Sequence, residues 1–314
     1  MKAPTKAESA RPIEAAPSLR LTVVGCAAAW STRPGRASSC YLVEIGDDAL
    51  VLDMGQGSFS LLAARRDPGS LRAVLISHLH ADHCIDLIPL RHYLKYAAPR
   101  GAARTSGGTS ARVKPQTVAM AGPHQERPHQ EHPPQEDPRD ARLELHGPVD
   151  LPARFDDFAR EAHLFAPLAF HPLVSGPLRL GPFDITVGRV THAERSFAFR
   201  VAPARRAGER RGPPGLVYSG DCGDPADLVP LVRPGDTLLA EAYWGAGPGV
   251  PEAHHLDAAG AARAASEGGA ARLVLTHLQD GFSASAARRA ARAFFGVEIL
   301  VARPGLVVEV SSGR

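Results

Sequence analysis

The sequence predicts a mixed α/β fold in which two β-sheets pack face to face with helices on their outer surfaces. Short apolar runs, partly β-branched, occur in both halves of the chain and are typical of buried strands. In each half, helical patterns follow the strands, so the later half repeats the order of the earlier one. Two such halves can pack sheet on sheet, which buries the apolar face of each.

The N-terminal half begins with strands and continues into helices. Apolar residues recur at helical spacing over Ser58–Arg66 and Leu87–Tyr96. The strands predicted in this half are Leu19–Gly25, Cys40–Ile45, Ala49–Leu52, Ala73–Ile76 and Thr117–Ala121.

The C-terminal half resumes after an irregular stretch. Helices are expected at Ala258–Glu267 and Ser285–Phe295. A last strand pair, Val297–Val301 and Leu306–Val310, is expected to be joined by a Pro304-Gly305 turn. The other predicted strands are Phe183–Val190, Phe197–Ala202, Gly215–Tyr218, Thr237–Ala240 and Arg272–Leu275.

The chain of 314 residues is expected to form one domain with a tail and an insertion. Residues 1–18, rich in Ala, Pro and charge, are typical of a disordered tail and have no apolar core of a signal peptide. The domain then covers residues 19–314, with a low-complexity insertion at about 101–150. Residues 122–140 nearly repeat Pro-His-Gln-Glu, a composition that remains solvated and binds metal at most adventitiously.

Composition excludes few functions. A net charge of +3 neither requires nor excludes a nucleic-acid partner. No apolar run approaches the roughly 20 residues of a membrane span, so we expect no membrane association. The four cysteines contain no CxxC and favour free buried thiols, with a Cys26–Cys40 bridge as the alternative. A cytoplasmic location is the expectation.

The most informative segment follows the predicted strand Ala73–Ile76. It reads His78-Leu79-His80-Ala81-Asp82-His83, and all its polar side chains can bind a metal. If strand geometry continues, His78 and His80 point the same way because side chains alternate with period two. One short segment then offers two imidazoles to one metal, and a carboxylate plus an imidazole to a second. A two-metal hydrolytic site needs such an arrangement.

Three later segments can complete this site. His192, Asp221 and His277 each come at the end of an apolar run. A sheet edge can hold such ligands rigidly while the adjoining loops shape a substrate pocket.

Together these motifs resemble those of the metallo-β-lactamase-fold hydrolase superfamily. The first matching motif is Asp53 in Leu52-Asp53-Met54-Gly55, and the histidine-rich segment, His192, Asp221 and His277 follow in the same order. The resemblance as a whole spans about residues 20 to 311. The resemblance implies a four-layer αββα sandwich with a dinuclear metal site at one edge of the sheets.

The resemblance also implies a ligand set. His78, His80 and His192 would bind the first metal, and Asp221 would bridge to the second. Asp53 would orient a ligand histidine through its ring N–H. Neutral imidazoles and carboxylates suit two Zn²⁺ ions, with Mn²⁺ or Fe²⁺ as alternatives, and a metal-bridging hydroxide would be the nucleophile. The ligands of the second metal would be Asp82, which is also expected to be essential for catalysis, His83 and His277.

Within the superfamily, the chain is most similar to the ribonuclease Z-like phosphodiesterase branch. That branch has a bridging aspartate in a Ser-Gly-Asp context, as in Ser219-Gly220-Asp221, and a Glu-Ala element matched by Glu241-Ala242. Its next histidine element is matched by His255, which would bind phosphate or act as a general acid while Glu241 orients it. His254 is the neighbouring alternative, and Asp257 is expected to cap the following helix.

Two departures from that branch bear on the substrate. The histidine that precedes the Glu-Ala pair is Ala240 here. Members that mature transfer RNA insert a long arm between the third-motif histidine and the bridging aspartate, whereas only 193–220 lie between them here. This length suits a β-hairpin with its tip at 204–214. The tip is basic, and its side chains are expected either to contact phosphate or to face solvent. The basic residues are Arg205, Arg206, Arg210 and Arg211.

The function predicted from the sequence is a dinuclear metal-dependent phosphodiesterase. Its substrate would be RNA or a small cyclic or linear phosphodiester. A thioester, lactone or other ester hydrolase of the same fold is the alternative. A catalytically silent nucleic-acid-binding module is disfavoured because the metal-ligand residues are intact. The resemblance also allows a homodimer, for which the sequence identifies no interface.

Overall fold

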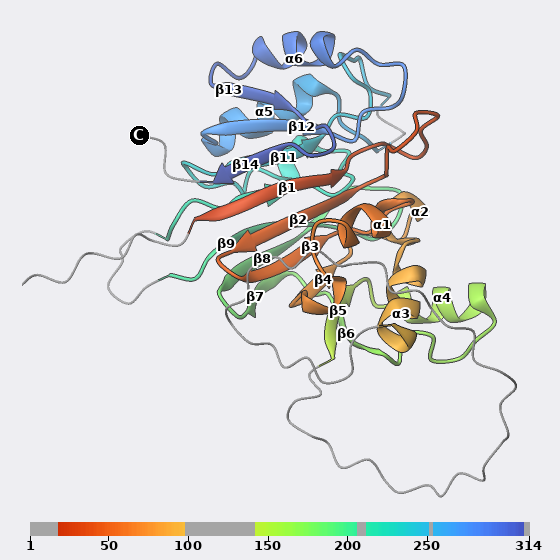
Figure 1. The fold of residues 1–314 in the computed structure, drawn as a ribbon. Coiled ribbons are helices and arrows are strands. Elements are labelled where there is room, and N and C mark those ends of the chain that lie inside the picture. Colours follow the sequence, from red (N-terminus) through yellow and green to blue (C-terminus); the bar gives the residue numbers. More distant parts are fainter. Residues whose placement is uncertain (1–17, 98–141, 206–211, 251–253, 311–314) are drawn as a thin grey trace, which may run out of the picture.

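The computed structural model describes residues 18–97, 142–205, 212–250 and 254–310. In this part of the chain, two seven-stranded sheets face each other (Figure 1). The first sheet has the order β14 (Val307–Val310), β1 (Leu19–Gly25), β2 (Cys40–Ile45), β3 (Asp48–Leu52), β4 (Ala73–Leu75), β5 (Leu143–Gly147) and β6 (Leu168–Pro172). The second has the order β13 (Glu298–Val301), β12 (Arg272–Thr276), β11 (Thr237–Glu241), β10 (Leu216–Tyr218), β9 (Ser196–Pro203), β8 (Phe183–Val190) and β7 (Gly176–Leu180).

Helices cover the outer face of each sheet. On the second sheet lie α5 (Ala258–Gly268) and α6 (Ala284–Arg292), which share an apolar cluster with β11 and β12. The helices on the side of the first sheet are α1 (Ser58–Ala63), α2 (Ala81–Cys84), α3 (Leu87–Tyr96) and α4 (Leu151–Ala159). Two 3₁₀ turns, Pro68–Ser70 and Pro225–Asp227, complete the described elements.

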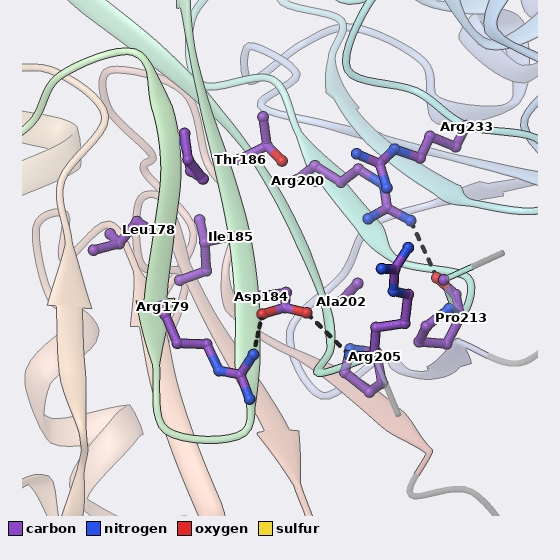
Figure 2. Close-up of a pocket in the computed structure, with 13 residues that line it drawn as sticks. Leu178, Arg179, Asp184, Ile185, Thr186, Arg200, Ala202, Arg205, Pro213 and Arg233 are labelled. Carbon is purple, nitrogen blue, oxygen red and sulfur yellow. Dashed lines mark hydrogen bonds and ion pairs between the residues drawn. The ribbon is translucent and has the colours of Figure 1, made fainter. Parts of the chain in front are cut away.

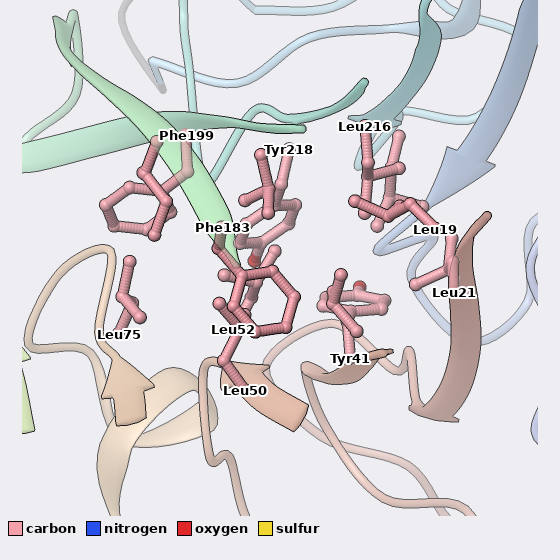
Figure 3. Packing of buried hydrophobic residues seen from close by; sticks show 14 of the residues in the cluster. Leu19, Leu21, Tyr41, Leu50, Leu52, Leu75, Phe183, Phe199, Leu216 and Tyr218 are labelled. Carbon is pink, nitrogen blue, oxygen red and sulfur yellow. The ribbon is translucent and has the colours of Figure 1, made fainter. Parts of the chain in front are cut away.

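The central core lies between the two sheets. Inward-facing side chains such as Leu50, Phe183 and Phe199 interdigitate there and are almost wholly buried (Figure 3). The rings of Tyr41 and Tyr218 approach to 4.9 Å from opposite sheets. This core and the two outer clusters confirm the predicted four-layer αββα sandwich.

Sheet topology determines where a site can form. Strands β3, β4, β5 and β6 are mutually parallel, and so are β10, β11, β12 and β13. Because the carboxyl ends of parallel strands meet at one edge of a sheet, the loops that follow them converge. The predicted ligands follow strands of both groups.

Several expectations need correction. Val297–Val301 and Leu306–Val310 do not form a strand pair, because β13 pairs with β12 while β14 pairs with β1 in the other sheet. The stretch expected to be irregular contains β5, α4, β6 and β7. The low-complexity insertion ends before about residue 150, since β5 is already part of the sheet from Leu143. These elements were missed because their runs are short and two of their strands lie at exposed edges.

Other expectations agree with the structure or lie outside it. All four cysteines are buried and free, so the predicted thiols are confirmed. The chain between His192 and Asp221 forms the predicted hairpin, with β9 antiparallel to β10. The predicted strand Thr117–Ala121, the tail and three of the four tip arginines lie outside the described residues. Within the described ranges, no helix is long and apolar enough to cross a membrane.

Candidate metal centre and active site

Six loops bring the predicted site residues together at the carboxyl edge of the sheets. Strand β4 ends at Leu75, earlier than expected, and the histidine-rich segment passes through a loop into α2. His80 caps this helix with an extended backbone, which turns Asp82 and His83 into its first turn. Asp53 and His277 follow β3 and β12 with positive φ angles of 59° and 55°. Such strained backbone is characteristic of functional sites.

The first cluster contains the ligands predicted for the first metal. His78 Nε2 lies 3.0 Å from His80 Nδ1, which lies 3.3 Å from His192 Nε2. Asp221 Oδ2 is 3.5 Å from His78 Nε2 and 4.0 Å from His192 Nε2. Ligand atoms of these four residues lie within 4.8 Å of one another and can hold one metal ion.

The second cluster adjoins the first through Asp221. His83 Nε2 is 3.6 Å from Asp82 Oδ2, and His277 Nε2 is 3.7 Å from the same oxygen. Asp221 Oδ1 lies 3.2 Å from His83 Nε2, and its Oδ2 lies 3.5 Å from His277 Nε2. The two carboxylate oxygens of Asp221 therefore contact both clusters, as the predicted bridging position requires.

The hydrogen bonding of two buried atoms in this centre indicates whether its residues fit metal ions. His83 Nε2 and Asp221 Oδ1 are buried and lie 3.2 Å apart, yet neither makes a hydrogen bond of good geometry among the described residues. A buried polar atom without a partner is costly, so its retention requires a compensating ligand. The His/Asp clusters thus fit divalent metal ions.

Asp53 contacts the second cluster through the ring of His83. It is fully buried and accepts hydrogen bonds from the backbone and hydroxyl of Ser77 and from the hydroxyl of Tyr218, at 2.6–2.8 Å. Its Oδ2 also lies 2.7 Å from His83 Nδ1. A donor at Nδ1 leaves the Nε2 lone pair of His83 directed at the cluster, in agreement with the orienting role expected for Asp53.

The charges of the centre follow from burial and mutual contact. Burial holds the pKa of His78 well below its usual value and lowers that of His277 to about 4, so both imidazoles are neutral at pH 7. Burial opposes a charge on His83, but Asp221, Asp53 and Asp82 outweigh it and raise its pKa. Burial likewise opposes ionisation of Asp221, yet the surrounding histidines hold its pKa well below its usual value.

A second titratable pair lies beside Asp221. His255 Nδ1 is 3.0 Å from Glu241 Oε1 and 3.8 Å from Asp221 Oδ2. Glu241 ends β11 and is fully buried, and burial raises its pKa to about 7. Burial alone would lower the pKa of His255, but Glu241 raises it above the usual value. The ring of Tyr243 stacks on that of His255 at 4.1 Å.

The neighbouring alternative, His254, contributes through its backbone. Its carbonyl oxygen lies 3.0 Å from His192 Nδ1 and orients that ring. Asp257 caps α5 as predicted, because its side chain accepts a hydrogen bond from the backbone of Gly260.

Sequence reasoning missed several residues around the centre. Ala29 donates its backbone N–H to Asp82 Oδ2 at 2.8 Å, and no side-chain pattern could have indicated this. Tyr218 directly precedes the Ser-Gly-Asp motif, and Tyr243 directly follows the Glu-Ala pair. These neighbouring positions could have identified both tyrosines from the sequence. Arginines also line cavities of about 300 Å³ beside His277 and about 180 Å³ beside Leu79. They are Arg33 and Arg36 in the first, and Arg154 and Arg195 in the second.

Comparisons with known proteins agree with this geometry. Residues 49–278 match the family model described as the beta-lactamase superfamily domain. An uncharacterized protein of Mycobacterium leprae is 32% identical over 83% of this chain and 78% of its own length. A ribonuclease Z of Myxococcus xanthus is 30% identical over 83% of this chain and 87% of its own length.

A solved structure shows the same fold. The metallo-beta-lactamase fold protein YhfI of Bacillus subtilis superposes with a TM-score of 0.69 at 24% identity, over 93% of this chain and 99% of its own. The family match covers the segment from β3 to the loop after β12, which carries every residue of the two clusters. The chain therefore belongs to the beta-lactamase superfamily.

Proposed function

We propose that the protein is a dinuclear metal-dependent phosphodiesterase that acts on RNA or on a small cyclic or linear phosphodiester. The observation that carries this proposal is the contact between buried Glu241 and partly buried His255, whose Nδ1 lies 3.0 Å from Glu241 Oε1 and 3.8 Å from Asp221 Oδ2. A metal centre alone serves many hydrolases, whereas an adjoining imidazole held in the proton-donating state suits a phosphodiester with a poor leaving group.

Nine residues take roles in this proposal. His78, His80 and His192 would hold the first ion, Asp82, His83 and His277 would hold the second, and Asp221 would contact both. Bound ions, most simply Zn²⁺, would supply Lewis acidity and lower the pKa of a bound water. His255 and Glu241 act on the substrate side.

His255 is placed to donate a proton to the leaving oxygen. Its Nδ1 is bonded to Glu241, so Nε2 is the atom free to face a substrate. Glu241 favours the charged imidazolium, which also binds a phosphoryl oxygen. The ring of Tyr243 stacks on the ring of His255 with an angle of 11° between the two planes, which restricts rotation of the imidazole.

Arginines with acidic partners line two cavities near the centre. Arg36 lines the cavity beside His277 and is paired with Asp280 at 2.9 Å. Arg154 lines the cavity beside Leu79 and is paired with Glu194 at 3.0 Å. The relative named ribonuclease Z is consistent with a phosphodiester substrate.

Hydrolysis of bis(p-nitrophenyl) phosphate tests the proposal. The full chain loaded with Zn²⁺ or Mn²⁺ is assayed beside a thioester and a lactone, with Glu267→Ala, an exposed position on α5, as the control variant. Metal-dependent cleavage of the phosphodiester supports the proposal. Cleavage of the carbonyl substrates alone would establish the alternative ester-hydrolase function and leave His255 and Glu241 without their roles. Homodimer formation and a cytoplasmic location stay predictions.

A further inference from the structure

A cavity of about 570 Å³ lies at the opposite end of the second sheet from the metal centre. It is lined by residues of β7, β8 and β9 and by the segments around Pro213 and Arg233 (Figure 2). Asp184 lines it near the start of β8, whereas His192 follows the end of that strand. At roughly 3.3 Å per strand residue, these two residues are about 25 Å apart. The cavity is therefore separate from the active site.

Four arginines line this cavity, and two of them are balanced by aspartates. Arg179 Nη1 donates to Asp184 Oδ1 at 2.6 Å. Arg200, which is 5% exposed, donates from Nε and Nη2 to both oxygens of the fully buried Asp236. Asp236 also accepts the backbone N–H groups of Gly215 and Arg233, so it has no capacity left for another cation.

The other two arginines, Arg205 and Arg233, are exposed and have no acidic partner among the described residues. Among the described residues, no acceptor binds the guanidinium of Arg205 or of Arg233. Figure 2 shows both side chains on the same side of the cavity as Arg200. Arg200 Nη1 also lacks an acceptor in the described ranges, so a rigid buried guanidinium presents a donor to the cavity. Like charges held together repel, and an anion between them removes that repulsion.

The rest of the lining is largely apolar. Ala202, Pro203 and Pro213 line it beside these arginines, whereas the side chains of Leu178 and Ile185 belong to the core between the sheets. A volume of 570 Å³ falls within the range of small-molecule sites. Two unbalanced guanidinium groups match the charge of a phosphate monoester, which is about −1.5 to −2 at pH 7.

We propose that this cavity is a second ligand site, which binds a phosphate monoester attached to a compact organic body of nucleotide size. Arg205, Arg233 and Arg200 Nη1 bind the phosphate, and Ala202 and Pro213 contact the body. The site requires neither metal nor the hydrolytic residues, so it stands independently of the proposed phosphodiesterase activity.

Isothermal titration with adenosine 5′-monophosphate tests the site on the metal-loaded full chain. The double variant Arg205→Ala/Arg233→Ala is expected to bind this probe more weakly by about tenfold or more, because it loses charge-assisted hydrogen bonds. Arg288→Ala removes the same charge from an exposed position on α6 and is expected to bind as the wild type does. Asp221→Ala, which removes the bridging residue of the metal centre, is expected to retain the binding that the double variant loses.

Three comparisons can overturn the assignment. Binding that disappears in Asp221→Ala and persists in the double variant would locate the probe at the metal centre. Equal affinity for adenosine would remove the role of the phosphate, and equal affinity for inorganic phosphate would remove that of the organic body. Much tighter binding of a 5′-phosphorylated RNA through the same arginines would replace the small ligand by a nucleic acid. Melting temperatures matched to the wild type exclude misfolding of the double variant, whose two side chains have no partner among the described residues.

Discussion

Asp53 Oδ2 lies 2.7 Å from His83 Nδ1, and both side chains are completely buried. This contact links the end of β3 to the first turn of α2. Because Asp53 also accepts hydrogen bonds from Ser77 and Tyr218, it joins both sheets beneath the proposed second metal. The orientation of one ligand ring thus depends on packing of the whole sandwich.

Asp53→Asn is expected to weaken binding of the second metal by about 10- to 100-fold while leaving the first in place. The amide keeps the shape of the carboxylate but can no longer accept every donor that surrounds it. Competitive metal titration with a chelator, followed by counting of bound ions, measures the effect. Equal loss of both ions would instead mean that Asp53 supports the whole centre.

Asp82→Ala is expected to abolish hydrolysis with little loss of stability. Asp82 is partly exposed and its carboxylate contacts ligand atoms of the second cluster and the backbone of Ala29. Activity, metal content and melting temperature are measured together, with Glu267→Ala as the control. Turnover near that of the wild type would disprove the assigned role of Asp82.

His255→Ala is expected to slow cleavage in a manner that depends on the leaving group. A general acid matters most for an alcohol, which leaves poorly without a proton, and least for p-nitrophenolate. Rates for a dinucleotide and for bis(p-nitrophenyl) phosphate are therefore compared at equal metal content. An equal loss for both substrates would favour phosphate binding over proton donation, and loss of metal would make His255 a ligand.

Glu241→Gln is expected to move the alkaline limb of the pH–rate profile to lower pH. Glu241 is a cause of the raised pKa of His255, so its neutral replacement lets the imidazole lose its proton at a lower pH. Activity that requires the charged imidazole is then lost earlier as pH rises. The profile of kcat/KM with a dinucleotide from pH 5 to 9 measures the shift. An unmoved limb would show that another group controls it.

Asp236→Ala is expected to destabilise the protein by about 3–5 kcal/mol, because it leaves Arg200 charged and buried without its partner. Urea unfolding of the metal-loaded chain measures the change in the free energy of unfolding. Exposed Arg20→Ala, which breaks a surface ion pair with Glu309, is the matched control and is expected to cost about 1 kcal/mol or less. Similar losses in both variants would contradict the role assigned to the buried pair.

The sequence by itself determined which metal-binding side chains gather at the centre and where most of the strands around it lie. The histidines and carboxylates are recognisable because each follows an apolar run, and that pattern arises from local burial. The strands of the first and last thirds were predicted within about one residue for the same reason. The order of the motifs also indicated the sandwich fold.

Only the tertiary structure decided how these pieces meet. It separated β13 from β14 into different sheets, added β5, β6 and β7, and brought both oxygens of Asp221 between two clusters. It also placed Tyr243 on His255 and gathered arginines from distant segments around one cavity. Such contacts join residues far apart in the chain and depend on sheet register and packing, which leave no periodic trace in the sequence.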